Sequence, residues 1–148
     1  MISRSIHIPK SYIDATLTQA PRVGRQLLEP IKSLAAQRGV PMNILEDHAV
    51  INKAEIHKNK SDLWLCMEGE AVFTCGGELI DPYVQEKEGV RNENELLGES
   101  IRGGTEIILR PGDWLWIPAG EAHQHQCVDT ARLVVIKIPS EKNSVQSG

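Results

Sequence analysis

Residues 110–125 read RPGDWLWIPAGEAHQH, and this stretch decides the fold. Residues 111–113 are turn formers, because proline presets φ, glycine accepts a positive φ and aspartate bonds the backbone that follows. Residues 114–117 are aromatic or branched, which favours a half-buried strand. Residues 118–120 end that strand, since proline donates no hydrogen bond to a ladder. The stretch therefore predicts a short strand between two turns, with a further strand beginning near residue 122.

The second strand of this stretch carries two histidines, His123 and His125. Side chains two residues apart on a strand point to the same face. We therefore expect both imidazoles to face the interior at one place. Their partners have to come from another part of the chain.

Composition limits the classes of protein that the chain can belong to. It has 148 residues with 20 acidic and 16 basic side chains, a length that suits one domain with a sizeable core. The chain has no stripe of basic residues that would indicate binding to nucleic acid, and no apolar run is long enough to span a membrane. Residues 1–7 show no apolar h-region and no cleavage site, so we expect no signal peptide, and the three cysteines form no Cys-x-x-Cys pair. We expect a cytoplasmic protein with free thiols and with neither nucleic acid nor membrane as a partner.

The chain divides into three parts by pattern. Residues 1–41 predict an N-terminal helical arm, with one helix over residues 12–18 and another that begins at Pro30 and stops at Gly39. Residues 42–139 contain short branched or aromatic runs between turns, which is typical of an all-β sandwich or barrel. Residues 140–148 are polar and predict a flexible tail. Residues 81–104 are charged and predict a long loop, with a short strand at residues 100–102.

Residues 55–69 offer partners for the histidine pair. His57 and Asn59 share one face of a predicted strand, and a turn at residues 60–61 follows. Asp62 then opens a return strand that ends at Gly69. A hairpin of this kind brings His57, Asn59 and Asp62 close together.

These two stretches resemble the sequence motifs of the cupins. The second cupin motif, Gly-x5-Pro-x-Gly-x2-His-x3-Asn, is met from Gly112 to His123, with Cys127 at the place of the asparagine. The first motif has a His-x-His pair, then an acid, then a glycine seven residues after the acid. His57 stands at its first histidine, Asn59 at its second and Asp62 at the acid, with a turn one residue shorter. Gly69 is the glycine seven residues after the acid. The resemblance covers residues 42–139 and is closest to small single-domain bacterial cupins.

The resemblance implies an all-β fold, a cupin jelly-roll β-barrel, with a metal site inside and often a homodimer. His57, Asp62 and His123 supply two imidazoles and a carboxylate, a set that suits Fe, Mn, Ni or Zn. Asn59 is a weaker, neutral donor that can coordinate loosely or leave its position to water. The alternative is a degenerate site, in which the two histidines are ordinary polar residues of the barrel interior.

Two further residues are candidates for catalysis. His125 can act as a general base near a bound substrate, or as a fourth ligand, or it is a partly exposed residue at the mouth of the barrel. Glu55 lies two residues before His57, where it can hold a ligating histidine in one tautomer or form part of a charged rim. Four residues are predicted to line the pocket, from their parity on the strands: Trp64, Cys66, Trp116 and Cys127.

From these features we expect a metal-dependent protein that binds or converts a small molecule. Its chemistry as an enzyme is that of a dioxygenase or of a sugar isomerase or lyase, and the sequence does not choose between them. The alternative function is a non-catalytic cupin that binds or senses a small molecule. No phosphate loop, dinucleotide motif or nucleophile elbow indicates another class of enzyme.

Overall fold

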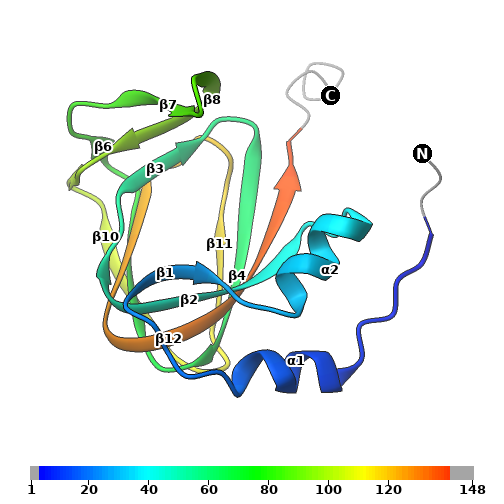
Figure 1. Ribbon diagram of the computed structural model, residues 1–148. Helices are drawn as coiled ribbons and strands as arrows, with labels where there is room; N and C mark the ends of the chain where they lie inside the picture. Colours follow the sequence, from blue (N-terminus) through cyan, green and yellow to red (C-terminus); the bar gives the residue numbers. More distant parts are fainter. Residues whose placement is uncertain (1–3, 141–148) are drawn as a thin grey trace, which may run out of the picture.

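The computed structural model describes residues 4–140, which form a barrel of antiparallel strands with two short helices at one side (Figure 1). The helices are α1 (Lys10–Leu17) and α2 (Ile31–Arg38). The strands in chain order are β1 (Gly24–Leu27), β2 (Met42–Ile51), β3 (Ala54–His57), β4 (Lys60–Glu68), β5 (Ala71–Cys75), β6 (Glu78–Leu79), β7 (Tyr83–Lys87), β8 (Val90–Gly98), β9 (Ile101–Arg102), β10 (Thr105–Leu109), β11 (Trp114–Ile117) and β12 (His123–Pro139).

The long strand β12 joins the two layers of the barrel. Its residues 123–126 pair with β5, whereas residues 132–139 pair with β4 and residues 130–136 with β2. A register shift between Cys127 and Thr130 marks the bend, which Figure 1 shows at the lower end of the barrel. β10 extends one layer beside β5, and β11 extends the other beside β4. This closure brings β3, β4 and the start of β12 together.

The core lies between the two layers and is apolar. Trp64 and Phe73 meet edge to face at its centre, with ring centroids 5.1 Å apart. Full burial of a side chain of this size contributes roughly 1.5–3 kcal/mol. The cluster of buried side chains consists of Leu45, Trp64, Cys66, Ala71, Phe73, Leu109, Ile117, Cys127, Ala131, Leu133 and Val135.

The two helices pack on the outer side of β2. Ile31 of α2, Leu28 and Ile44 form a second buried cluster there. The predicted helices are present, α1 two residues earlier than expected and α2 ending before Gly39 as expected. None of the helices in the described residues is long and apolar enough to cross a membrane.

Two features of the structure differ from the sequence analysis. β1 was missed, because its residues, GRQL, show no apolar alternation; it pairs with β2 and adds a strand from within residues 1–41. The predicted loop at residues 81–104 is mostly a β-hairpin of β7 and β8, joined by a two-residue turn in which Glu88 and Gly89 have φ of 52° and 80°. Both faces of this hairpin carry polar side chains, so no alternating pattern identifies its strands. The short strand expected at residues 100–102 is present as β9. The predicted tail lies, except for Ser140, outside the described residues.

Candidate metal centre

Two strands supply the centre of the site. Glu55 and His57 alternate on β3, so both point to one side of the strand. His123, the first residue of β12, pairs with Glu55 in the ladder. The rings of His57 and His123 consequently lie 4.9 Å apart between centroids.

The side chains of Glu55, His57 and His123 converge on one point. Glu55 Oε2 lies 3.3 Å from His57 Nε2 and 3.8 Å from His123 Nε2. One ligand atom from each of these residues lies within 4.8 Å of the others, a spacing that can hold a metal ion. His57 is 7% exposed and His123 is 2% exposed, so the cluster is screened from bulk water.

Asp62 of β4 faces the same two imidazoles. Its Oδ2 lies 3.5 Å from His57 Nε2 and 3.5 Å from His123 Nε2. Within residues 4–140, Asp62 Oδ2 and His123 Nε2 are buried and lack any hydrogen-bond partner. Buried polar atoms without partners are costly, and a bound cation would satisfy both atoms. The donor set of two imidazoles and two carboxylates therefore fits a divalent metal.

The outer partners of the histidines fix their tautomers. His57 Nδ1 donates to Glu95 Oε1 at 2.6 Å, and His123 Nδ1 donates to the Glu121 carbonyl at 3.1 Å. Both oxygen atoms act only as acceptors, so Nδ1 carries the hydrogen in each ring. Both Nε2 atoms then face the cluster. This arrangement, an outer acceptor behind a ligating histidine, is usual at metal sites.

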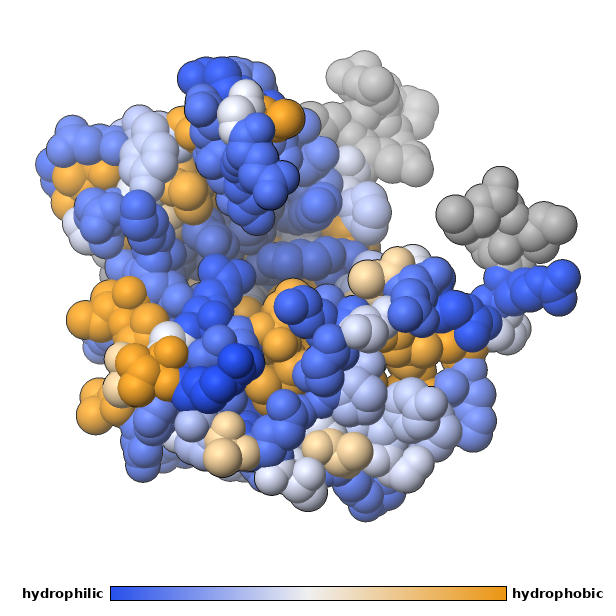
Figure 2. Space-filling model, viewed as in Figure 1, coloured by the Kyte–Doolittle hydropathy of each residue, from blue (hydrophilic) through white to orange (hydrophobic). Residues whose placement is uncertain are grey.

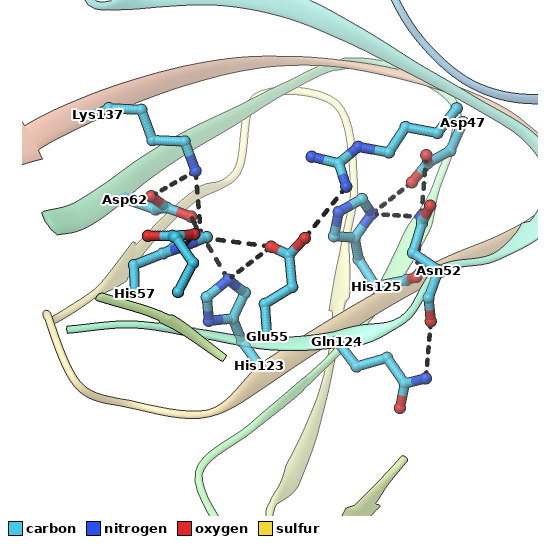
Figure 3. A network of polar contacts seen from close by, with 11 residues as sticks. Asp47, Asn52, Glu55, His57, Asp62, His123, Gln124, His125 and Lys137 are labelled. Atoms are coloured by element: carbon cyan, nitrogen blue, oxygen red, sulfur yellow. Dashed lines mark hydrogen bonds and ion pairs between the residues drawn. The ribbon is translucent and has the colours of Figure 1, made fainter. Parts of the chain in front are cut away.

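Lys137 of β12 borders the cluster on the other side of Asp62. Its Nζ donates to Asp62 Oδ1 at 2.8 Å and lies 3.3 Å from His57 Nε2 (Figure 3). This bond engages Oδ1 and leaves Oδ2 directed at the imidazoles. The ammonium also brings a positive charge to the place where a metal would bind.

The charges of the cluster shift the pKa values of its members. Burial lowers the pKa of His57, but the carboxylates of Asp62 and Glu55 beside it outweigh burial and raise the pKa to about 9. Burial also lowers the pKa of His123 to about 4, and the charge of His57 adds to this effect. Burial would raise the pKa of Asp62, yet His57 and Lys137 lower it to about 2. Burial would also raise the pKa of Glu55, but the neighbouring His57 and Arg25 outweigh burial and lower this pKa.

The structure moves the match to the first motif by two residues toward the N-terminus. Glu55 and His57 are the pair on β3, and Asn59 lies in the turn between β3 and β4. The Asn59 carbonyl accepts a bond from Ser140, and its side chain makes no hydrogen bond to the cluster among the described residues. Glu55 therefore stands where the first histidine was expected, and the match no longer needs a shortened turn. The predicted ligand Asn59 is not brought to the cluster.

His125 lies in the core and belongs to a separate group. Its Nδ1 donates to Asp47 Oδ2 at 2.5 Å, and Asn52 contacts both residues. The His125 ring lies 5.1 Å from the Trp64 ring and 5.2 Å from that of Phe73, measured between centroids. It is 3% exposed, so the alternative of a partly exposed residue at the mouth of the barrel was wrong. In Figure 3 Glu55 lies between this group and the imidazoles of His57 and His123.

The residues predicted to line the pocket have different positions. Trp116 is 51% exposed on the outside of β11, because Leu115 and Ile117 take the inward face; its prediction was wrong. Trp64 is in the core and borders a small hollow of about 180 Å³. Cys66 is in the core, and Cys127 borders two other surface hollows.

A larger cavity, of about 690 Å³, opens over Glu55 and His57. Figure 2 shows a recess with mainly hydrophilic walls on this face of the molecule, below the β7–β8 hairpin. Its size is in the range of pockets for small molecules. The lining residues are Arg25, Asn52, Lys53, Glu55, His57, Lys60, Gln85, Lys87, Asn92, Glu95, Leu97 and Lys137.

Sequence reasoning missed two residues of the site. Glu95 lies in the segment predicted as a loop, and only the pairing of β8 with β3 places it opposite His57. Lys137 could have been found, because it is the one charge within the apolar run VVIKI at residues 134–138. A charge in such a run needs a partner, and the buried Asp62 supplies it.

Comparison with known proteins identifies the fold. No protein-family model matches the chain, and no curated protein matches its sequence. Among solved structures, oxalate oxidase in complex with the substrate analogue glycolate matches with a TM-score of 0.52 and 20% identity over 85% of this chain and 58% of that one. Escherichia coli ycfD matches with a TM-score of 0.54 and 16% identity over 88% of this chain and 38% of that one. EutQ of Clostridium difficile, at 16% identity and a TM-score of 0.41, is matched over 70% of this chain and about half of its own length (54%).

These similarities establish the fold and no specific activity, because the identities are low. The chain has a cupin-type fold, as its motifs indicated. The fold carries a cluster of Glu55, His57 and His123 that can hold a metal.

Proposed function

We propose that this protein binds one divalent transition metal through His57, His123, Glu55 and Asp62, and that it binds or converts a small molecule in the adjoining cavity. The observation that carries the proposal is the pair of buried, unpartnered atoms Asp62 Oδ2 and His123 Nε2, which face each other at 3.5 Å. A cation is the partner that both atoms lack.

The donor set limits the metal. Two imidazoles suit Fe, Zn and Ni, and the two carboxylates add hard oxygen donors of the kind that Mn accepts. A bound metal of this class would supply Lewis-acid or redox chemistry. Around it, Glu95 and Glu121 orient the imidazoles, and Lys137 orients Asp62. Both kinds of enzyme expected from the sequence, a dioxygenase and a sugar isomerase or lyase, are compatible with such a site.

Metal titration tests the proposal. Chelator-treated protein is titrated by calorimetry with Mn(II), Fe(II), Ni(II) and Zn(II) under anaerobic conditions, and we expect one site per chain for at least one metal. His123→Ala removes a buried ligand and should weaken binding at least about ten-fold, an effect typical even of residues that only orient ligands. His7→Ala is the matched control, because His7 is exposed and lies outside the site. Absence of binding by all four metals overturns the proposal.

A second candidate function, binding without turnover, is favoured by Lys137. Its ammonium lies 2.8 Å from Asp62 and can take the place of a metal charge beside that carboxylate. A metal-free ligand-binding protein would then result. Oxygen uptake with catechols, diketones and thiols, set beside NMR of epimerisable and unsaturated sugars, separates turnover from binding alone.

A further inference from the structure

The lining of the large cavity is dominated by cations. Arg25, Lys53, Lys60, Lys87 and Lys137 face two carboxylates, Glu55 and Glu95. The chain as a whole has a formal net charge of −4, so the sign of the charge at the cavity is opposite to that of the whole molecule. Charges of one sign in a concave site raise the local concentration of ligands of the opposite sign.

The two carboxylates of the lining are already engaged. Glu95 accepts the hydrogen bond from His57 at 2.6 Å, and Glu55 forms ion pairs with His57 and Arg25 at 3.3 Å. Of the lysines, Lys53 contacts Tyr83 and Glu99 outside the lining. Lys87 makes no ion pair within residues 4–140. Part of the positive charge of the cavity therefore has no internal counter-charge.

Lys137 places one cation at the inner end of the cavity. Its ammonium has three N–H groups, and Asp62 accepts one of them. The side chain remains 34% exposed, so the ammonium can reach a ligand while it holds Asp62. A ligand that enters as far as His57 meets this charge.

The remaining lining is polar. Asn52, Gln85 and Asn92 offer amide groups that can hydrogen-bond hydroxyl or carbonyl oxygens, and Leu97 is the only apolar side chain among the lining residues described. Such a wall gives little burial to an aromatic or aliphatic ligand. It suits a small molecule rich in oxygen.

We propose that the cavity binds a small oxygen-rich anion, and that Lys87 and Lys137 contact its carboxylate or phosphate oxygens. This proposal rests on the proposed function, because the anion is the small molecule that is bound or converted beside the metal cluster. The new element is the chemical class of that molecule.

The test measures binding of defined probes by calorimetry, with chelator-treated protein and with Mn(II)-loaded protein at low salt. Malonate, 3-phosphoglycerate and inorganic phosphate are the anionic probes, and malonamide is the neutral analogue of malonate. We expect at least one anion to bind, malonamide to bind at least about ten-fold more weakly than malonate if malonate is a ligand, and binding to weaken as salt is raised. Preference for malonate or for the phosphates identifies the anionic group.

Neutralised variants assign the contact. Lys87→Gln and Lys137→Gln should each lower the affinity for the anion about five-fold, the factor that corresponds to the loss of one exposed charge pair. Lys32→Gln, on the exposed side of α2, is the matched control and should leave binding unchanged. The proposal is overturned if no anion binds in either form of the protein, if malonamide binds as tightly as an anionic probe, or if all three variants behave alike. Metal titration of the same samples is independent, so a failure of the anion proposal is distinguishable from a failure of the metal site.

Discussion

The metal affinity of the Glu95→Gln variant distinguishes a metal-binding centre from a group of buried polar side chains that binds no metal. The carboxylate accepts the Nδ1–H of His57 at 2.6 Å and is in the part of β8 that pairs with β3. The variant keeps the shape of the side chain and removes its charge. The bond that it weakens is charge-assisted, and such an outer contact to a metal-ligating histidine contributes about 10–100-fold to metal affinity.

That factor corresponds to about 1.4–2.7 kcal/mol of binding free energy. The assay is competition for the metal against a chelator of known affinity, followed by absorbance or fluorescence of the chelator. Glu93→Gln is the matched control, because Glu93 lies two residues earlier on the same strand, is 69% exposed and pairs with the neighbouring Arg91. Equal metal affinities for Glu95→Gln and Glu93→Gln would refute the assignment of His57 as a ligand held by Glu95.

Three further predictions concern the fold. Gly69→Ala should destabilise the protein by several kcal/mol in urea unfolding, because a Cβ there would lie 1.8 Å from the Thr130 carbonyl and φ is +72°; a midpoint like that of the parent would contradict the described turn. Phe73→Ala should cost about 3–5 kcal/mol in the same assay, because the ring is fully buried; a loss below about 1 kcal/mol would contradict its place in the core. Burial raises the pKa of Cys66 and of Cys75 to about 11, so both thiols stay protonated at pH 8; mass spectrometry should show slow alkylation by iodoacetamide, and labelling at the rate of a free thiol would contradict it.

The barrel was predictable because its signals are local. The turn residues around β11 and the histidine at the start of β12 have the spacing of a known motif. Figure 1 shows that the strands between these turns are part of a barrel. β7 and β8 were not predictable by the same means. Their side chains are polar on both faces, so periodicity carries no information on where the strands lie.

The site was predictable in part, for a physical reason. His57, Asp62 and His123 were found because chain spacing and strand parity place them, and the structure places Asp62 Oδ2 3.5 Å from Nε2 of each histidine. The role of Glu55 as a ligand was not predicted, because the first motif was aligned two residues too late along the chain. That alignment placed the His-x-His pair at His57 and Asn59 instead of at Glu55 and His57. The partners Glu95 and Lys137 come from strand pairings between distant segments, which no local pattern specifies.

The position of a bound metal tests the central claim most directly. Crystals of the protein soaked with Mn(II) or Zn(II) would be measured at the absorption edge of the metal, and the anomalous difference map would locate it. We predict one peak, within about 2.0–2.3 Å of Nε2 of His57 and of His123 and of a carboxylate oxygen of Glu55 or Asp62. A map without a peak at this cluster, with the Lys137 ammonium still bound between His57 and Asp62, would contradict the account.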